Sequence, residues 1–209
     1  EMPQSAVQVL VDRSGSVAIY SGTSDIGQGS NHMLAALVAQ YLGISAEDRV
    51  VLEADTGLTP VDLGSYSSRV TFMAGNAAVD AAEKLARTLR ESLAAKWECE
   101  PESVRLKDGE AIKLEDPEQR MPFPNAVVLA ESEGGTLSAV GHYKPPKIGS
   151  RFRRQSVGPS PAYSFTAQVA EVEVIVDDRD RARLNLWTKA GRAASDDQEL
   201  APQRFEDAH

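Results

Sequence analysis

Patterns typical of a strand pair, a helix and a further strand follow one another near the start of the chain. Residues 6–22 alternate apolar and polar side chains around a turn at Gly15, which predicts a β-hairpin. Residues 30–42 have the apolar spacing of a helix and are followed by Gly43, a residue type typical of helix ends. Residues 48–56 predict a short strand. This succession predicts an α+β fold of α/β layers.

The rest of the chain adds a second long helix and further strands. Residues 69–97 are rich in alanine, with apolar residues every three or four positions, and predict the longest helix. A hairpin is predicted at residues 102–116, turning at Asp108–Gly109, and a short helix before Gly134–Gly135. Strands are expected from residue 136, within 162–178 and over 181–191. We expect mixed sheets with two long helices in one domain over residues 1–190. Residues 191–209 predict a disordered tail.

Composition narrows the possible partners and the compartment. The 209 residues carry a net charge of −9, which disfavours nucleic acid and anionic membranes as ligands. No apolar run is long enough to cross a bilayer, and the start of the chain does not resemble a secretory signal. The basic segment 144–154 is interpreted as a solvated loop in preference to an anion site. Cys99 is the only cysteine, which leaves no disulfide or zinc cluster and suggests a cytoplasmic protein.

The stretch "SDIGQGS", residues 24–30, places two glycines where a strand pattern meets a helix pattern. A phosphate-binding P-loop would need lysine at position 28, which is Gln28, and a dinucleotide fingerprint would need glycine at position 32, which is His32. What remains is a turn in which Gly27 and Gly29 leave backbone N–H groups open beside the amide of Gln28. Such a turn suits a polar ligand read by hydrogen bonds. By itself the motif slightly favours a tight turn made for packing.

A second polar cluster, "GSYSSR" at residues 64–69, precedes the long helix. Hydroxyl groups, backbone donors and a guanidinium at a helix start are suited to an anionic or polar ligand. The alternative is an ordinary serine cap, which needs only one of these serines. Two such helix starts in one α/β unit could converge on the same ligand.

The motifs "GTSDIGQGS", "VAQYLGI", "DTGLTPVDLGSYSSRVTFMAGNAA" and "SPAYSFTAQVAEVEV" occur here in that order. Together they resemble the molybdopterin-binding large subunit of the xanthine dehydrogenase and aldehyde oxidase family. The resemblance covers about residues 5–186, and "GHYKPP" looks most like the α-type subunit of 4-hydroxybenzoyl-CoA reductases. On this resemblance, residues 1–190 are part of a molybdenum-cofactor-binding domain.

The resemblance implies a molybdenum–pyranopterin cofactor, often in the cytosine dinucleotide form, with 2Fe–2S and FAD carried by partner subunits or domains of a hetero-oligomer. The pterin holds the metal, so no side chain of this chain is expected to be a metal ligand, and none is expected to be catalytic. The residues implied to bind the cofactor all lie at the two helix starts: Gly27, Gln28, Gly29, Ser30, Gly64, Ser65, Tyr66, Ser67, Ser68 and Arg69.

Departures from the family pattern limit what this chain does by itself. His32 stands where a small hydroxyl residue is usual and is interpreted as a bystander, and after Trp187 the family pattern is lost. The family's glutamate base, in a Val-Gly-Glu motif, is not found here. We therefore expect an inactive fragment of an oxidoreductase for aromatic heterocycles, aldehydes or aromatic thioesters. The alternative is a non-catalytic binding or scaffold module that keeps the fold.

Overall fold

The computed structural model divides the chain into two compact units, residues 1–162 and 163–209. The structure describes residues 4–52, 55, 57–145, 166–176, 182–192 and 203–204. The described helices and strands of the first unit are, in chain order, β1 (Ser5–Val11), β2 (Val17–Ser21), α1 (Ser30–Leu42), η1 (Ala46–Asp48), β3 (Arg49–Leu52), α2 (Arg69–Trp97), η2 (Pro101–Ser103), β4 (Val104–Lys107), β5 (Glu110–Lys113), β6 (Asp116–Pro122), α3 (Phe123–Gly134) and β7 (Leu137–Tyr143).

A four-stranded mixed sheet in the order β3-β2-β1-β7 forms the centre of the first unit. β1 pairs antiparallel with β2, with Val9 opposite Ile19, and antiparallel with β7, with Val9 opposite Ala139. β3 pairs parallel with β2, and α1 makes the crossover between them. The mixed sheet and the two long helices confirm the predicted α+β class.

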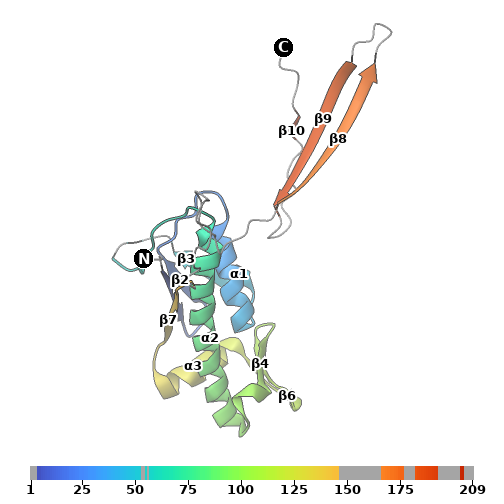
Figure 1. The fold of residues 1–209 in the computed structure, drawn as a ribbon. Helices are drawn as coiled ribbons and strands as arrows, with labels where there is room; N and C mark the ends of the chain where they lie inside the picture. The colour runs from blue at the N-terminus through green and yellow to red at the C-terminus, as the bar shows by residue number, and fades with distance from the viewer. Residues whose placement is uncertain are drawn as a thin grey trace, which may run out of the picture. The chain divides into compact units, whose positions relative to one another are not determined.

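The two long helices lie side by side over the sheet, as Figure 1 shows. Alternate residues of β1, Val7, Val9 and Val11, are fully buried and join one core cluster with apolar residues of α1 and α2. α2 crosses β7 so closely that a Cβ built on Gly141 would lie 1.9 Å from the carbonyl oxygen of Ala77. Glycine at position 141 therefore fixes how near the longest helix comes to the sheet.

The predicted helix bounds are confirmed, because the local end signals agree with the packing. α1 spans Ser30–Leu42 and ends at Gly43, whose left-handed backbone lets its N–H donate to the Ala39 carbonyl. α2 spans Arg69–Trp97 as expected. The predicted hairpin at Asp108–Gly109 is confirmed, but the sequence missed its third strand, β6, whose residues are mostly exposed and lack an apolar alternation.

The second unit contains an antiparallel sheet in the order β10-β9-β8, formed by β8 (Thr166–Val176), β9 (Ala182–Arg192) and β10 (Gln203–Arg204). The predicted pairing of the two long strands is confirmed. β9 extends two residues past 190, and β10 lies within the predicted tail, whose other residues fall outside the described ones. The boundary at residue 190 stays a prediction. Within the described ranges, no helix is both long and apolar enough to span a membrane.

Candidate functional site

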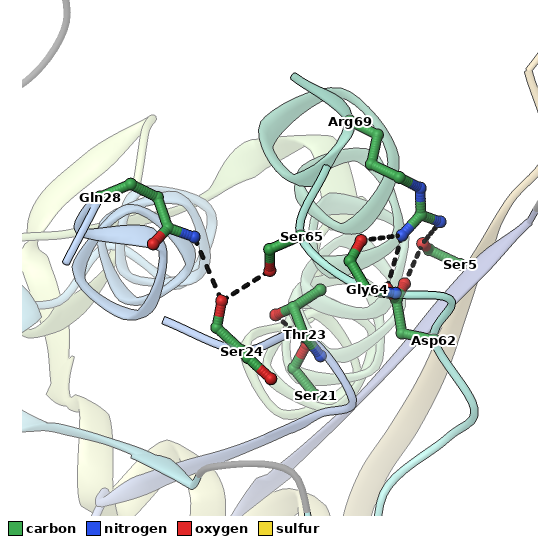
Figure 2. Close-up of polar contacts among 9 residues, drawn as sticks. All are labelled: Ser5, Ser21, Thr23, Ser24, Gln28, Asp62, Gly64, Ser65 and Arg69. Carbon is green, nitrogen blue, oxygen red and sulfur yellow. Dashed lines mark hydrogen bonds and ion pairs between the residues drawn. The ribbon is translucent and has the colours of Figure 1, made fainter. Parts of the chain in front are cut away.

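The loops that precede α1 and α2 meet through one carbonyl oxygen (Figure 2). The backbone oxygen of Ser24 accepts a hydrogen bond of 2.6 Å from the Ser65 hydroxyl and one of 3.1 Å from Nε2 of Gln28. Ser65 lies 41 residues from Ser24, so this contact is tertiary. The structure therefore brings the two predicted polar clusters together at one place.

The glycines of the first loop have two different roles. Gly27 and Gly29 have φ values of 95° and 78°, and a Cβ on either would meet nothing within 4 Å. Glycine is used there for its left-handed backbone, and the space beside it is open. A Cβ on Gly22, by contrast, would lie 2.4 Å from the carbonyl oxygen of Pro60. The packing role belongs to Gly22, and the other two glycines leave room for a ligand.

The backbone N–H groups of this loop are not open, which corrects the sequence expectation. Oδ1 of Asp25 accepts hydrogen bonds from the N–H groups of Gly27 at 2.9 Å and Gly29 at 3.3 Å. Oδ2 of Asp25 accepts from the N–H of Asn31 at 3.1 Å, in the first turn of α1. These donors, that of Asn31 first, lower the pKa of the Asp25 carboxyl below its usual 3.8. A carboxylate of the chain itself thus occupies the positive end of the helix.

The amide of Gln28 is engaged with its own loop. Its Oε1 accepts a 2.6 Å hydrogen bond from the N–H of Ile26, and Nε2 donates to Ser24 and, at 3.1 Å, to the hydroxyl of Ser30. Gln28 is nevertheless exposed, and Ser30 is buried at the first position of α1. Gln28 holds the turn in shape, and its contact with a cofactor stays a prediction.

Arg69 is buried and paired inside the protein. Nη1 of Arg69 lies 2.5 Å from Oδ1 of Asp62, and the two side chains are 6% and 1% exposed. Nη1 also donates to the Gly64 carbonyl at 2.8 Å, and Nη2 donates to the Ser5 hydroxyl at 3.1 Å. In this structure the guanidinium binds the loop and strand β1, so its predicted contact with a cofactor phosphate stays a prediction.

The remaining predicted residues, Tyr66, Ser67 and Ser68, lie between Ser65 and Arg69 along the chain. The Tyr66 ring lies 5.6 Å from the guanidinium carbon of Arg69 and is half exposed. Ser67 and Ser68 have φ values of 52° and 54°, a left-handed conformation that is uncommon for residues other than glycine. Ser68 directly precedes α2 but makes no side-chain capping hydrogen bond, so the simple serine-cap alternative does not describe this helix start.

Two aspartates of the site were missed from the sequence. Asp25 lies ahead of Gly29, the N-cap residue of α1, so it does not occupy a capping position, and only the folded loop brings its carboxylate to the N–H of Asn31. Asp62 precedes the glycine of "DLGS", a pattern typical of an Asx turn, and its Oδ1 accepts the N–H of Gly64 at 2.9 Å. No signal pointed to Ser5. His32 is exposed on α1, and its role stays open.

A profile of the molybdopterin cofactor-binding domain family matches residues 1–185. The chain is 35% identical over 113 residues to the 6-hydroxypseudooxynicotine dehydrogenase complex subunit gamma of Paenarthrobacter nicotinovorans, which covers 54% of this chain and 14% of that protein. It is 30% identical over 156 residues to the putative xanthine dehydrogenase molybdenum-binding subunit XdhA of Escherichia coli K12, covering 69% and 20%.

A solved structure supports the same relationship. Reconstituted CO dehydrogenase from Oligotropha carboxidovorans superposes with a TM-score of 0.63 at 28% identity, covering 69% of this chain and 18% of that one. The chain therefore spans only about a fifth or less of the length of the proteins it matches.

Proposed function

This chain belongs to the molybdopterin cofactor-binding domain family, and on that premise we propose that residues 22–30 and 57–69 form one side of the cofactor site of a molybdenum hydroxylase large subunit. The observation that carries the proposal is the hydrogen bond of 2.6 Å between the Ser65 hydroxyl and the Ser24 carbonyl. It joins the two loops that carry all the residues assigned by motif.

The residues present fit a pterin better than a phosphate. The open space beside Gly27 and Gly29 lets a planar group approach the backbone. The charged groups nearby, Asp25 and Arg69, are engaged within the protein, and a carboxylate at the start of α1 repels an anion there. The neutral groups are engaged too, but the hydroxyl oxygen of Ser65 and Oε1 of Gln28 can each accept a further hydrogen bond, which suits a ring that carries several donors. We therefore assign the pterin, and not its phosphates, to the loop before α1.

When bound, the molybdenum–pterin group supplies the oxidation–reduction chemistry. The residues of this chain bind and orient it: Gly27 and Gly29 give it access to the backbone, and Ser65 sets the distance between the two loops. Gln28 holds the first loop in shape through its three hydrogen bonds. Among the described residues no cluster of His, Cys, Asp or Glu could hold a metal ion.

For the whole protein we propose an oxidoreductase acting on an aromatic heterocycle, an aldehyde or an aromatic thioester. The supporting names are those of its relatives, a xanthine dehydrogenase molybdenum-binding subunit and a subunit of a dehydrogenase complex. We further propose the cytosine dinucleotide form of the cofactor, 2Fe–2S and FAD partners in a hetero-oligomer, and a cytoplasmic location.

The test is the molybdenum and pterin content of the purified full-length protein that carries this chain. We expect both in equal amounts. A Ser65→Ala variant should retain less of each, because it loses the hydrogen bond to the Ser24 carbonyl that joins the two loops. Ser132→Ala is the matched control, since its hydroxyl makes a hydrogen bond of the same 2.6 Å length to the Leu129 carbonyl, on α3. Absence of molybdenum and pterin from the wild type would favour the scaffold alternative.

A further inference from the structure

A buried ion pair at the start of α2 is the most enclosed charged feature among the described residues of the first unit. The side chains of Arg69 and Asp62 are 6% and 1% exposed. Removing two charges from water is costly, and their mutual attraction repays that cost only when the geometry is good and further hydrogen bonds are made. The Nε of Arg69 is buried as well and has no hydrogen-bond partner. Such a pair is poorly explained by stability alone.

The pair holds the two peptide groups that flank the α-carbon of Gly64. The N–H of Gly64 donates to Oδ1 of Asp62 at 2.9 Å, and the carbonyl of Gly64 accepts from Nη1 of Arg69 at 2.8 Å. Gly64 has a φ of 111°, which only glycine adopts without strain. The hydroxyl of the next residue, Ser65, donates the hydrogen bond to the Ser24 carbonyl that joins the two loops (Figure 2). The ion pair thus fixes the residue immediately before the contact that joins the two loops.

The same pair is anchored to the central sheet through Ser5, the first residue of β1. The Ser5 hydroxyl donates to Oδ2 of Asp62 at 2.5 Å and accepts from Nη2 of Arg69 at 3.1 Å. Ser5 is 1% exposed and pairs across the sheet with Tyr143 of β7. A rigid strand therefore supports the ion pair, and the ion pair supports the loop.

We propose that Asp62 and Arg69 are positioning residues that preset the loop before α2 for the cofactor, acting through Gly64 and Ser65. This inference rests on the proposed function. A guanidinium is required because two of its nitrogens reach three acceptors on different segments, whereas a lysine ammonium could not match this planar fork. The loop is ordered before the ligand arrives, which lowers the entropy cost of binding.

The test uses Asp62→Asn and Arg69→Lys in the full-length protein. In the cofactor-free form, backbone amides of residues 62–66 should exchange hydrogen roughly tenfold faster or more, since a hydrogen bond to a charged group is lost. In the loaded form, pterin and molybdenum should be released faster by a similar factor. Ser5→Ala, which keeps the ion pair and removes only its anchor, should give a smaller change in both measurements.

Two control variants separate positioning from stability. Asp80→Asn removes a carboxylate paired with Lys84 on the same helix, outside the loop, and should leave cofactor release unchanged. Leu85→Ala truncates a buried core residue of α2 and lowers stability without touching the loop. If Leu85→Ala speeds cofactor release as much as Asp62→Asn at equal loss of thermal stability, the pair is merely structural and the proposal is overturned.

The outcomes for the two proposals are distinguishable. If the wild type holds no molybdopterin, the proposed function fails, and the exchange rates of residues 62–66 still decide whether the pair orders the loop. If the wild type holds the cofactor and Asp62→Asn and Arg69→Lys release it at the wild-type rate, the positioning role fails while the proposed function stands.

Discussion

Replacing Gly29 by alanine separates a backbone role from a ligand-contact role. Gly29 has a φ of 78°, and a Cβ there would meet nothing within 4 Å. Gly109, at the turn between β4 and β5, has a φ of 77° and equally open space, so it is a matched control remote from the cofactor loops. The two substitutions impose the same backbone strain in different places.

The expected loss of stability is small and equal at the two positions. A left-handed backbone costs a residue with a Cβ about 1–2 kcal/mol. Alanine also has fewer conformations than glycine in the unfolded chain, and this stabilises the folded protein by about 0.4–1 kcal/mol. The net loss in the free energy of unfolding is about 1 kcal/mol, equivalent to a melting temperature lower by about 2–4 °C for a chain of this size.

The effect on the cofactor should differ. If the pterin lies against Gly29, the added methyl group overpacks the contact at a cost of about 1–3 kcal/mol. That cost corresponds to roughly five- to 150-fold weaker retention. Urea unfolding of the 209-residue chain followed by circular dichroism measures the first quantity, and pterin content of the full-length variants measures the second. Equal pterin content in Gly29→Ala and Gly109→Ala would refute the assignment of Gly29 to the cofactor.

Three further outcomes are expected. Gly141→Ala should lower the free energy of unfolding by about 1–3 kcal/mol or more, measured by urea unfolding, because its Cβ would lie 1.9 Å from the Ala77 carbonyl oxygen. The pKa of the Asp25 carboxyl is lowered, first by the N–H of Asn31, so its carboxylate should stabilise the loop fully above pH 3.8. This contribution should be lost as the pH falls through the lowered pKa. The free energies of unfolding of the wild type and Asp25→Asn should therefore converge in acid. Lys84→Met should change the free energy of unfolding by under about 1 kcal/mol, because its ion pair is exposed, and a larger loss would contradict this reading.

Local signals were sufficient for the helices and insufficient for the site. The bounds of α1 and α2 follow from apolar spacing and from end residues such as Gly43, which act within a few residues of each end. β6 was missed because an exposed strand carries little apolar alternation. The role of Arg69 was not evident from sequence, because its partners Asp62 and Ser5 lie 7 and 64 positions away.

The sequence by itself determined the family, the layered α+β class and the two loops that carry the candidate site, because glycine and serine patterns next to helices are local and specific. Only the tertiary structure decided how those loops work. The fold pairs the N–H groups before α1 with the carboxylate of Asp25 and buries Arg69 against Asp62. It also joins the two loops through the hydrogen bond to the Ser24 carbonyl. Each of these contacts depends on which groups the packed sheet and helices bring within hydrogen-bond distance, and spacing along the chain does not encode that distance.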